Sequence, residues 1–225
     1  MGLFSTRSFA LFLGITLATA APAPAAIAAQ VLSGAPAAAN ARVADFGYSG
    51  SGCPQGSAES GFDTAINADR GYFHDLTAFM TPNASQADRS NNCQMHISVT
   101  CDPGWEFTLK PHSTKLTAHV NLGDGATAVY LTSYYFSEAA TQTATVRYSF
   151  DGPLNDCPTI ADPAPNIDYP RSGGGGGLLV VNRRVALTGD SRSAVGSIQL
   201  WGDADDGNGK NANFVPWRAF EWSRC

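Results

Sequence analysis

Hydrophobic and polar residues alternate strictly along several stretches of the chain. In residues 93–101, CQMHISVTC, one face carries Cys93, Met95, Ile97, Val99 and Cys101. Residues 115–122 and 143–150 alternate in the same way. Because successive side chains of a β-strand point to opposite faces, this pattern predicts half-buried strands with one wet face.

Further short runs have the composition of strands and are separated by turn sequences. They span residues 62–66, 72–80, 105–110, 128–136, 178–187, 197–201 and 217–223. Gly, Asp and Asn dominate the connections, as in ADRG, DPG, GDG and DDGNG. Since no stretch shows a long 3.6-residue apolar stripe, we predict an all-β fold, a two-sheet antiparallel β-sandwich or jelly-roll-like domain stapled by disulfides.

The N-terminal residues have the layout of a secretory signal peptide rather than of folded structure. Arg7 precedes an apolar run of about a dozen residues, shorter than the ~20 residues that span a membrane. Small residues follow, so we predict a signal peptide over 1–20, with cleavage as late as 28. Residues 21–42 are rich in Ala and Pro and are predicted to be a lead-in, and 43–225 a single β-sandwich domain.

The charge balance excludes one class of partner. The chain has a formal net charge of −5, and its lysines are Lys110, Lys115 and Lys210. Because neutralising phosphates requires a basic stripe, which this sequence lacks, we expect no nucleic-acid partner. The sequence shows no second apolar run of membrane-spanning length, so we expect no membrane span.

Five cysteines follow the predicted signal peptide, which indicates disulfide bonds formed in an oxidising compartment. Two bridges and one free thiol can be drawn in about fifteen ways. Cys93 and Cys101 lie on one predicted strand, about 26 Å apart at ~3.3 Å per residue, and so cannot pair with each other. The absence of C-x-x-C spacing argues against zinc.

Two polar motifs suggest further chemistry. Asp203, Asp205, Asp206 and Asn208 supply hard oxygen donors suited to Ca²⁺, but the EF-hand pattern fails because Asn208 and Phe214 occupy its Gly and Glu positions. We therefore favour a solvated turn, with an irregular calcium loop as the alternative and no other cofactor. Asn83-Ala84-Ser85 is an N-glycosylation sequon between two predicted strands.

The remaining candidates for chemistry have simple structural explanations. The Gly-Asp-Ser triplet within residues 189–193 reads as a polar turn rather than as a nucleophile. His96 and His119 lie on polar strand faces and could be neighbours, although unremarkable surface histidines are favoured. The aromatic residues that could stack on a sugar are Trp105, Trp201, Trp217, Trp222, Tyr134 and Tyr135, but core packing is the expected role of most.

Several short motifs, taken in order, resemble one known family. They are GSGCPQGS at 50–57, NNCQMHI at 91–97, GWEF at 104–107, YYFS at 134–137, FDGP at 150–153 and the final WSRC. Together they are similar to the secreted family catalogued as domain of unknown function 4360, over nearly the whole chain after residue 47. The resemblance implies secretion, disulfides and a β-rich fold, and it supplies no catalytic residues.

The cysteines depart from the pattern of that family. Members similar to this chain carry a cysteine just before the strand matched by GLLVVNRRVAL, where this chain has Ser172 and glycines. The resemblance implies a Cys53–Cys93 pair. As the disulfide partner of Cys225 we favour Cys157, which leaves Cys101 as the free thiol. The competing scheme pairs Cys101 with Cys157 and leaves Cys225 free.

These observations favour a secreted binding or cell-surface module over an enzyme, with a carbohydrate or cell-wall polysaccharide as the leading ligand. The alternative is a secreted hydrolase that uses two carboxylates across a cleft on polysaccharide. Converging carboxylates in an apolar-walled pocket would favour the hydrolase. A flat row of exposed aromatics would favour the binding module.

Overall fold

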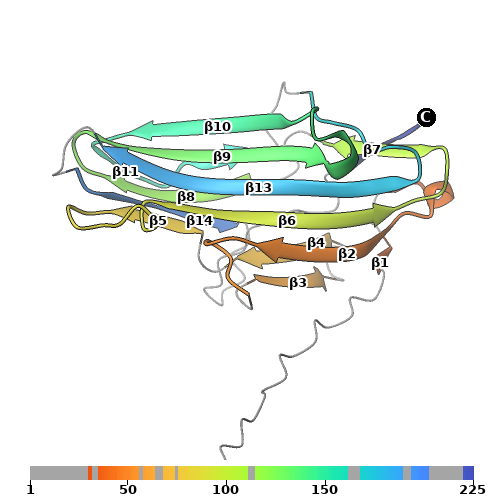
Figure 1. The fold of residues 1–225 in the computed structure, drawn as a ribbon, viewed down its shortest axis with the longest axis horizontal. Helices are drawn as coiled ribbons and strands as arrows, with labels where there is room; N and C mark the ends of the chain where they lie inside the picture. The colour runs from red at the N-terminus through yellow and green to blue at the C-terminus, as the bar shows by residue number, and fades with distance from the viewer. Residues whose placement is uncertain are drawn as a thin grey trace, which may run out of the picture.

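The largest sheet of the computed structural model has six strands in the order β1-β2-β6-β13-β9-β10, and it faces the viewer in Figure 1. Its strands are β1 (Gln30–Val31), β2 (Arg42–Ser49), β6 (Ser90–Thr100), β13 (Gly176–Gly189), β9 (Ala126–Phe136) and β10 (Ala144–Asp151). Every strand pair among the described residues is antiparallel.

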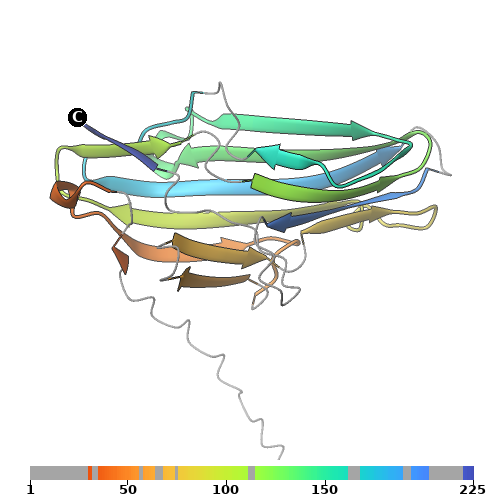
Figure 2. The ribbon, with the colours of Figure 1, turned by 180° about the vertical axis from the view of Figure 1, so that it is seen from behind.

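The second layer lies behind this sheet and consists of smaller sheets (Figure 2). The five-stranded sheet contains β11 (Leu154–Asp156), β8 (Lys115–Leu122), β14 (Gly196–Gly202), β5 (Thr77–Met80) and β12 (Thr159–Ala161). Two further pairs are β7 (Trp105–Leu109) with β15 (Phe220–Arg224), and β3 (Ala58–Asp63) with β4 (Ala68–Phe73). In Figure 2, which views the molecule from behind, the β7–β15 pair lies in front of one end of the six-stranded sheet and β8–β14 in front of the other. The predicted all-β, sandwich-like antiparallel architecture is confirmed.

The structure describes residues 30–31, 35–55, 58–63, 68–73, 76–110, 115–161, 168–189, 194–202 and 220–225. The predicted signal peptide and the Asp203, Asp205, Asp206 and Asn208 set lie outside these residues, so both stay predictions. Asp190 and Ser191 of the Gly-Asp-Ser triplet, His74, His112 and Trp217 also lie outside them.

The core lies between the two layers, and the alternation read from the sequence identifies it. Met95 and Ile97 of β6 are 0% exposed, and so are Leu116 and Val120 of β8. Arg183 of β13 also points inward and is only 2% exposed, the largest fully buried side chain of the described residues. The two-residue period of β13 puts it on the same face as Val181 and Val185.

The predicted and observed strands differ in places, and two of these differences have a clear cause. The run 72–80 divides into β4 and β5, because its halves pair with different strands, β3 and β14. Strand β2 was missed because its register shifts between Val43 and Asp45, and such a bulge interrupts the alternation of side chains.

The packed part of the chain begins slightly before the predicted boundary at residue 43. Ala39 and Ala41 are 0% and 2% exposed, and the carbonyl of Ala39 accepts a hydrogen bond from the N–H of Asp102 at 2.8 Å. Ala37–Ala39 form a short 3₁₀ helix, η1; the second, η2, is Ser137–Ala139. In the described part of the chain, neither helix has the length and apolarity to cross a bilayer.

The glycine run before β13 is a hydrogen-bonded turn. The N–H of Gly176 donates to the carbonyl of Gly173 at 3.3 Å, and the N–H of Gly175 donates to that of Trp105 at 3.1 Å. Gly175 and Gly176 have φ of +97° and +113°, and a Cβ on Gly176 would collide with the carbonyl of Val99. Only glycine adopts this conformation without strain, so the run joins β7 tightly to the start of β13.

The cysteines follow the sequence prediction only in part. Cys53 and Cys93 form a disulfide with a Cα–Cα distance of 5.3 Å, and both are fully buried. The predicted Cys157–Cys225 pair is not formed: both are exposed free thiols, and Cys101 is a half-buried one. The reason is topological, because Cys157 lies between β11 and β12 along β8, whereas Cys225 follows β15, which pairs with β7.

Candidate functional site

Strands β7 and β15 form a small two-stranded platform with an inner and an outer face. Phe220 pairs with Leu109 and Trp222 with Phe107, and these side chains face the core. Glu221 pairs with Thr108 and Ser223 with Glu106, on the opposite face. The alternation of both strands therefore gathers two carboxylates and two hydroxyls on one outward surface.

An aromatic cluster holds this pair of strands against the six-stranded sheet. The ring of Phe107 lies 5.2 Å from that of Phe136 on β9, 4.7 Å from Phe220 and 5.1 Å from Trp222, measured between centroids. The Phe136 and Phe220 contacts are edge-to-face, a favourable geometry for aromatic pairs. Since Phe107 is 0% exposed, the outer face rests on a closely packed base.

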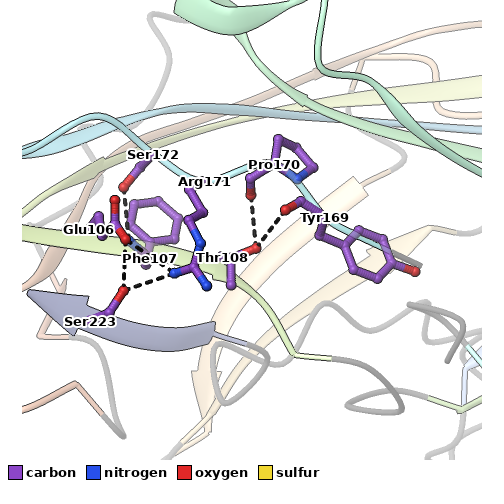
Figure 3. A network of polar contacts seen from close by, with 8 residues as sticks. All are labelled: Glu106, Phe107, Thr108, Tyr169, Pro170, Arg171, Ser172 and Ser223. Atoms are coloured by element: carbon purple, nitrogen blue, oxygen red, sulfur yellow. Dashed lines mark hydrogen bonds and ion pairs between the residues drawn. The ribbon is translucent and has the colours of Figure 1, made fainter. Parts of the chain in front are cut away.

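The segment 168–172 runs along the free edge of β7 and extends the platform. Ser172 and Phe107 exchange two hydrogen bonds: the N–H of Ser172 donates to the carbonyl of Phe107 at 2.8 Å, and the N–H of Phe107 donates to Oγ of Ser172 at 2.9 Å. The hydroxyl of Thr108 lies between the carbonyls of Tyr169 and Pro170, 3.2 and 2.8 Å away (Figure 3). We call this segment together with β7 and β15 the β7–β15 platform.

Arg171 ties the three elements of the platform together on its outer face. Its Nη1 donates to Oε1 of Glu106 at 3.2 Å and to Oγ of Ser223 at 2.9 Å. The hydroxyl of Ser223 in turn donates to the same Glu106 oxygen at 2.9 Å (Figure 3). Because the Arg171 side chain is 55% exposed, this network orders polar groups at the surface more than it stabilises the fold.

A cavity of about 410 Å³ opens beside this network. It is lined by Thr108, Leu109, Gln142, Asp168, Tyr169, Pro170, Arg171 and Glu221. Asp168 and Glu221 contribute carboxylates, Arg171 a guanidinium and Gln142 an amide. Tyr169 packs edge-on against buried Tyr134 of β9, with centroids 5.3 Å apart, so its ring is held in place.

This set of groups suits the recognition of a neutral polar ligand. Carboxylate, guanidinium and amide groups offer planar pairs of acceptors or donors, which match the paired hydroxyls of a ligand such as a sugar. Within the described residues, no group of three or more His, Cys, Asp and Glu side chains is arranged to hold a metal ion.

A second depression, of about 490 Å³, lies where β9 begins and where β10 and β13 end, and it offers less chemistry. It is lined by Gly125, Ala126, Thr127, Asp151, Gly152, Thr188 and Gly189. Its ionisable group, Asp151, accepts a hydrogen bond from the hydroxyl of Thr127 at 2.9 Å. The β7–β15 platform is therefore the better candidate for a functional site.

The aromatic residues that the structure describes do not form the exposed row that would favour sugar stacking, and the two histidines are not the neighbours that the sequence allowed. Tyr134 is buried, while Trp105, Trp222 and Tyr135 are half-buried, so these four make no flat row of exposed rings. The side chain of Trp201 lies outside the described residues. His96 lies on β6 of the six-stranded sheet and His119 on β8 of the five-stranded sheet, each pointing away from the core, so they are not neighbours.

Asn83 lies in an exposed turn before β6. The Ser85 hydroxyl of its sequon donates to the Asp88 carboxylate at 2.7 Å, and the Ser85 N–H donates to it at 2.8 Å. These bonds hold the pKa of Asp88 below its usual value and fix the shape of the turn.

Sequence reasoning missed most of the platform. Asp168 and Arg171 lie in the Pro- and Gly-rich segment before β13, where no strand was predicted, and Gln142 lies in the connection after η2. Glu106 and Glu221 are more than a hundred residues apart, a spacing that gives no sign that they share a surface. The alternation of β7 and β15 was the available signal, since it puts both on polar faces.

This chain matches a curated relative, two solved structures and one family model. An uncharacterised secreted protein of the fungus Arthroderma benhamiae is 27% identical over 172 residues, 76% of this chain and 68% of the relative. The solved structure of TmCBM61 in complex with β-1,4-galactotriose covers 80% of this chain and 88% of its own at 10% identity, with a TM-score of 0.22.

The enzymatically active domain of tailspike protein 4 from bacteriophage CBA120 covers 70% of this chain and 19% of its own at 12% identity, with a TM-score of 0.24. Both TM-scores are too low to carry an argument. The model of the domain of unknown function DUF4360 matches residues 39–225. The chain is thus a secreted protein that belongs to the DUF4360 family.

Proposed function

We propose that this secreted protein binds polysaccharide of a cell wall or cell surface through the β7–β15 platform. The observation that carries the proposal is the cavity of about 410 Å³, whose lining includes Arg171, Gln142, Asp168, Glu221 and Tyr169. Planar polar groups that hydrogen-bond hydroxyls, next to a fixed aromatic side chain, are the combination that a sugar ring requires.

The charge of the platform narrows the class of polysaccharide. Glu106 is ion-paired with Arg171, Asp168 and Glu221 line the same cavity as Arg171, and the whole chain carries a net charge of −5. An acidic polysaccharide would meet like charges at this surface, whereas a neutral or amino-sugar polymer would not. We therefore expect neutral glucans, chitin or its deacetylated form as ligands, and not polyuronates.

The test is retention of the mature protein on insoluble chitin, β-glucan, cellulose and immobilised polyuronate, with the bound fraction measured at several polysaccharide concentrations. Retention is expected on at least one neutral or amino-sugar polymer and not on polyuronate. Arg171→Ala should weaken retention about tenfold, because one hydrogen bond to a charged group is worth about 1.5 kcal/mol.

Arg147→Ala is the matched control, because Arg147 is also an exposed arginine but lies on β10. It should leave retention unchanged. Loss of retention that is equal in both variants would mean that charge, not the platform, is responsible. Retention of the original protein on none of the neutral or amino-sugar polymers would overturn the proposal.

A second candidate function is polysaccharide hydrolysis, and it is favoured by the presence of both Asp168 and Glu221 on one cavity. Glycoside hydrolysis uses two carboxyl groups, one as an acid and the other as a base or nucleophile. The same assays test it by measuring released reducing sugar. Asp168→Asn and Glu221→Gln should each abolish release but weaken retention no more than Arg171→Ala does, and the absence of release by the original protein excludes hydrolysis.

We also infer that the protein enters the secretory route through the predicted signal peptide and that Asn83 carries an N-linked glycan where the host supplies one. Exposure of Asn83 in a turn supports the second inference. Intact-mass analysis of the secreted protein, with Asn83→Gln as the comparison, tests both. An N-terminus at Met1 would contradict the first inference, and a mass that the substitution changes only by its added methylene group would contradict the second.

A further inference from the structure

Cys101 lies directly after β6, beside the glycine turn that precedes β13. Its N–H donates to the carbonyl of Gly175 at 3.1 Å, and its Sγ donates to the carbonyl of Trp105 at 3.3 Å. The same Trp105 carbonyl accepts the N–H of Gly175 at 3.1 Å. The sulfur of Cys101 is therefore held against the turn formed by residues 173–176.

Cys225 reaches the same turn from the other side. Its N–H donates to the carbonyl of Gly104 at 3.2 Å, which continues the pairing of β15 with β7 by one residue. Its Sγ lies 3.3 Å from the place that a Cβ on Gly174 would occupy. Figures 1 and 2 both show the C-terminus at the end of the molecule where β7 lies.

Both cysteines thus lie against one short turn, Cys101 through the hydrogen bond of its N–H to Gly175 and Cys225 through its Sγ beside Gly174. Burial raises the pKa of Cys101, a backbone hydrogen bond with Gly175 opposes that shift, and the neighbouring Cys225 and Asp102 raise the pKa further. Because Cys225 contributes to the pKa of Cys101, its thiol lies close to that of Cys101, in agreement with the contacts of both residues with the turn.

We propose that Cys101 and Cys225 form a second disulfide in the secreted protein. Cys157 is the cysteine left over: it is exposed, its N–H donates to Oδ1 of its neighbour Asp156, and the strands on either side of it pair with β8. Among the described residues, its contacts do not bring it to Cys101 or Cys225. This proposal concerns the covalent structure and does not depend on the polysaccharide proposal.

Formation of the bond requires an oxidant, which the secretory compartment supplies as a disulfide such as glutathione disulfide or the active site of an oxidoreductase. The exposed Cys225 thiolate attacks a sulfur of that disulfide and releases one thiol. Cys101 then attacks the mixed disulfide at the Cys225 sulfur and releases the second thiol. In sum the two cysteines lose two protons and two electrons, and the oxidant gains them as two thiols.

The bond would fasten the end of β15 to the end of β6. Among the described residues β15 pairs only with β7, so its last residues are held by the pairing of Arg224 with Trp105 and by the hydrogen bond from Cys225 to Gly104. A cross-link at Cys225 joins the β7–β15 platform covalently to the six-stranded sheet.

The experiment is a disulfide map of the full chain, secreted by its host and purified without reductant. Cleavage after glutamate and methionine gives the peptides 96–106, which contains Cys101, and 222–225, which contains Cys225. Because Met95 separates Cys93 from Cys101, the two cysteines of this strand are distinguished. The expected species is 96–106 joined to 222–225, lighter by two hydrogens than the separate thiol peptides and absent after reduction.

Counting thiols in the denatured, unreduced protein gives an independent readout. The proposal predicts one alkylatable thiol per chain, Cys157, out of five cysteines. Cys157→Ser should lower the count to zero and keep the cross-linked peptide, whereas Cys101→Ser should expose Cys225 to alkylation. Three alkylatable thiols, or 222–225 joined to the Cys157 peptide, would overturn the proposal.

Discussion

The two ends of strand β6 are closed in different ways. Near its start, Cys93 is bonded to Cys53, and both residues are fully buried in the core. Just past its other end, Cys101 is a half-buried thiol, and closure there comes from a hydrogen-bonded glycine turn and the aromatic cluster around Phe107. One end combines a covalent bond with burial, while the other relies on packing and backbone hydrogen bonds.

This difference shows that one end of β6 contributes to stability and the other supports the candidate site. The Cys53–Cys93 end has its reactive atoms enclosed, so it can contribute only to stability. The Cys101 end carries the β7–β15 platform, where Arg171 and Glu106 are exposed in part and available to a ligand. A functional surface needs open polar groups, so its support must come from beneath, here from Phe107 and Ser172.

The largest expected effect is the loss of the buried disulfide. Replacing Cys53 and Cys93 together by Ala should lower the free energy of unfolding by about 4 kcal/mol, because the bond closes a loop with a sequence separation of 40 residues. Denaturant unfolding of the oxidised proteins measures it. Cys157→Ala, at an exposed thiol, is the control and should change stability by less than about 0.5 kcal/mol.

The next effect tests whether the other end of β6 is covalently closed as well. In the oxidised protein, Cys225→Ser should cost about 2–4 kcal/mol, below the ~5 kcal/mol that the chain-entropy model gives for a loop of roughly 120 residues, because one end of the bond is the exposed last residue of the chain. After full reduction the substitution should cost almost nothing relative to the reduced parent. Equal stability of the oxidised variant and its oxidised parent would mean that packing alone closes this end.

A smaller effect is expected beneath the platform. Ser172→Ala leaves the N–H of Phe107 without the hydroxyl that accepts it at 2.9 Å, in a place where Ser172 is 3% exposed. Leaving a buried donor unpaired should cost about 1–2 kcal/mol. Ser90→Ala is the matched control at the start of β6, because Ser90 accepts an exposed hydrogen bond from Arg184, and its cost should be near zero. Equal costs would remove the distinction between the two ends.

The smallest stability effect is expected on the outer face itself. Arg171→Ala should change the free energy of unfolding by no more than about 0.5 kcal/mol, because the ion pair with Glu106 is exposed and screened by solvent. Thermal unfolding, run beside the polysaccharide retention assay, separates the two roles of the residue. A loss above about 2 kcal/mol would make Arg171 a structural residue and weaken its assignment to ligand binding.

Much of the fold could be predicted from local pattern. The alternation in residues 93–101 located β6 and its buried face correctly, and the same holds for β8 and β10. Strand β2 was missed because the shift between Val43 and Asp45 breaks the two-residue period. The candidate site was predicted poorly, because its residues come from β7, β15, the segment 168–172 and the turn after η2.

The sequence by itself determined the layered β architecture, because the side-chain period of a strand is a local property that residue order expresses directly. Which strands become neighbours was decided by the tertiary structure. Pairing of β7 with β15 brings Glu106 next to Ser223. The turn at Gly174 and Gly175 contacts both Cys101 and Cys225, whereas Cys157 lies elsewhere, along β8. Such contacts depend on how the sheets pack against each other, because burial of the shared core selects long-range neighbours. The periodicity of the sequence does not reveal them.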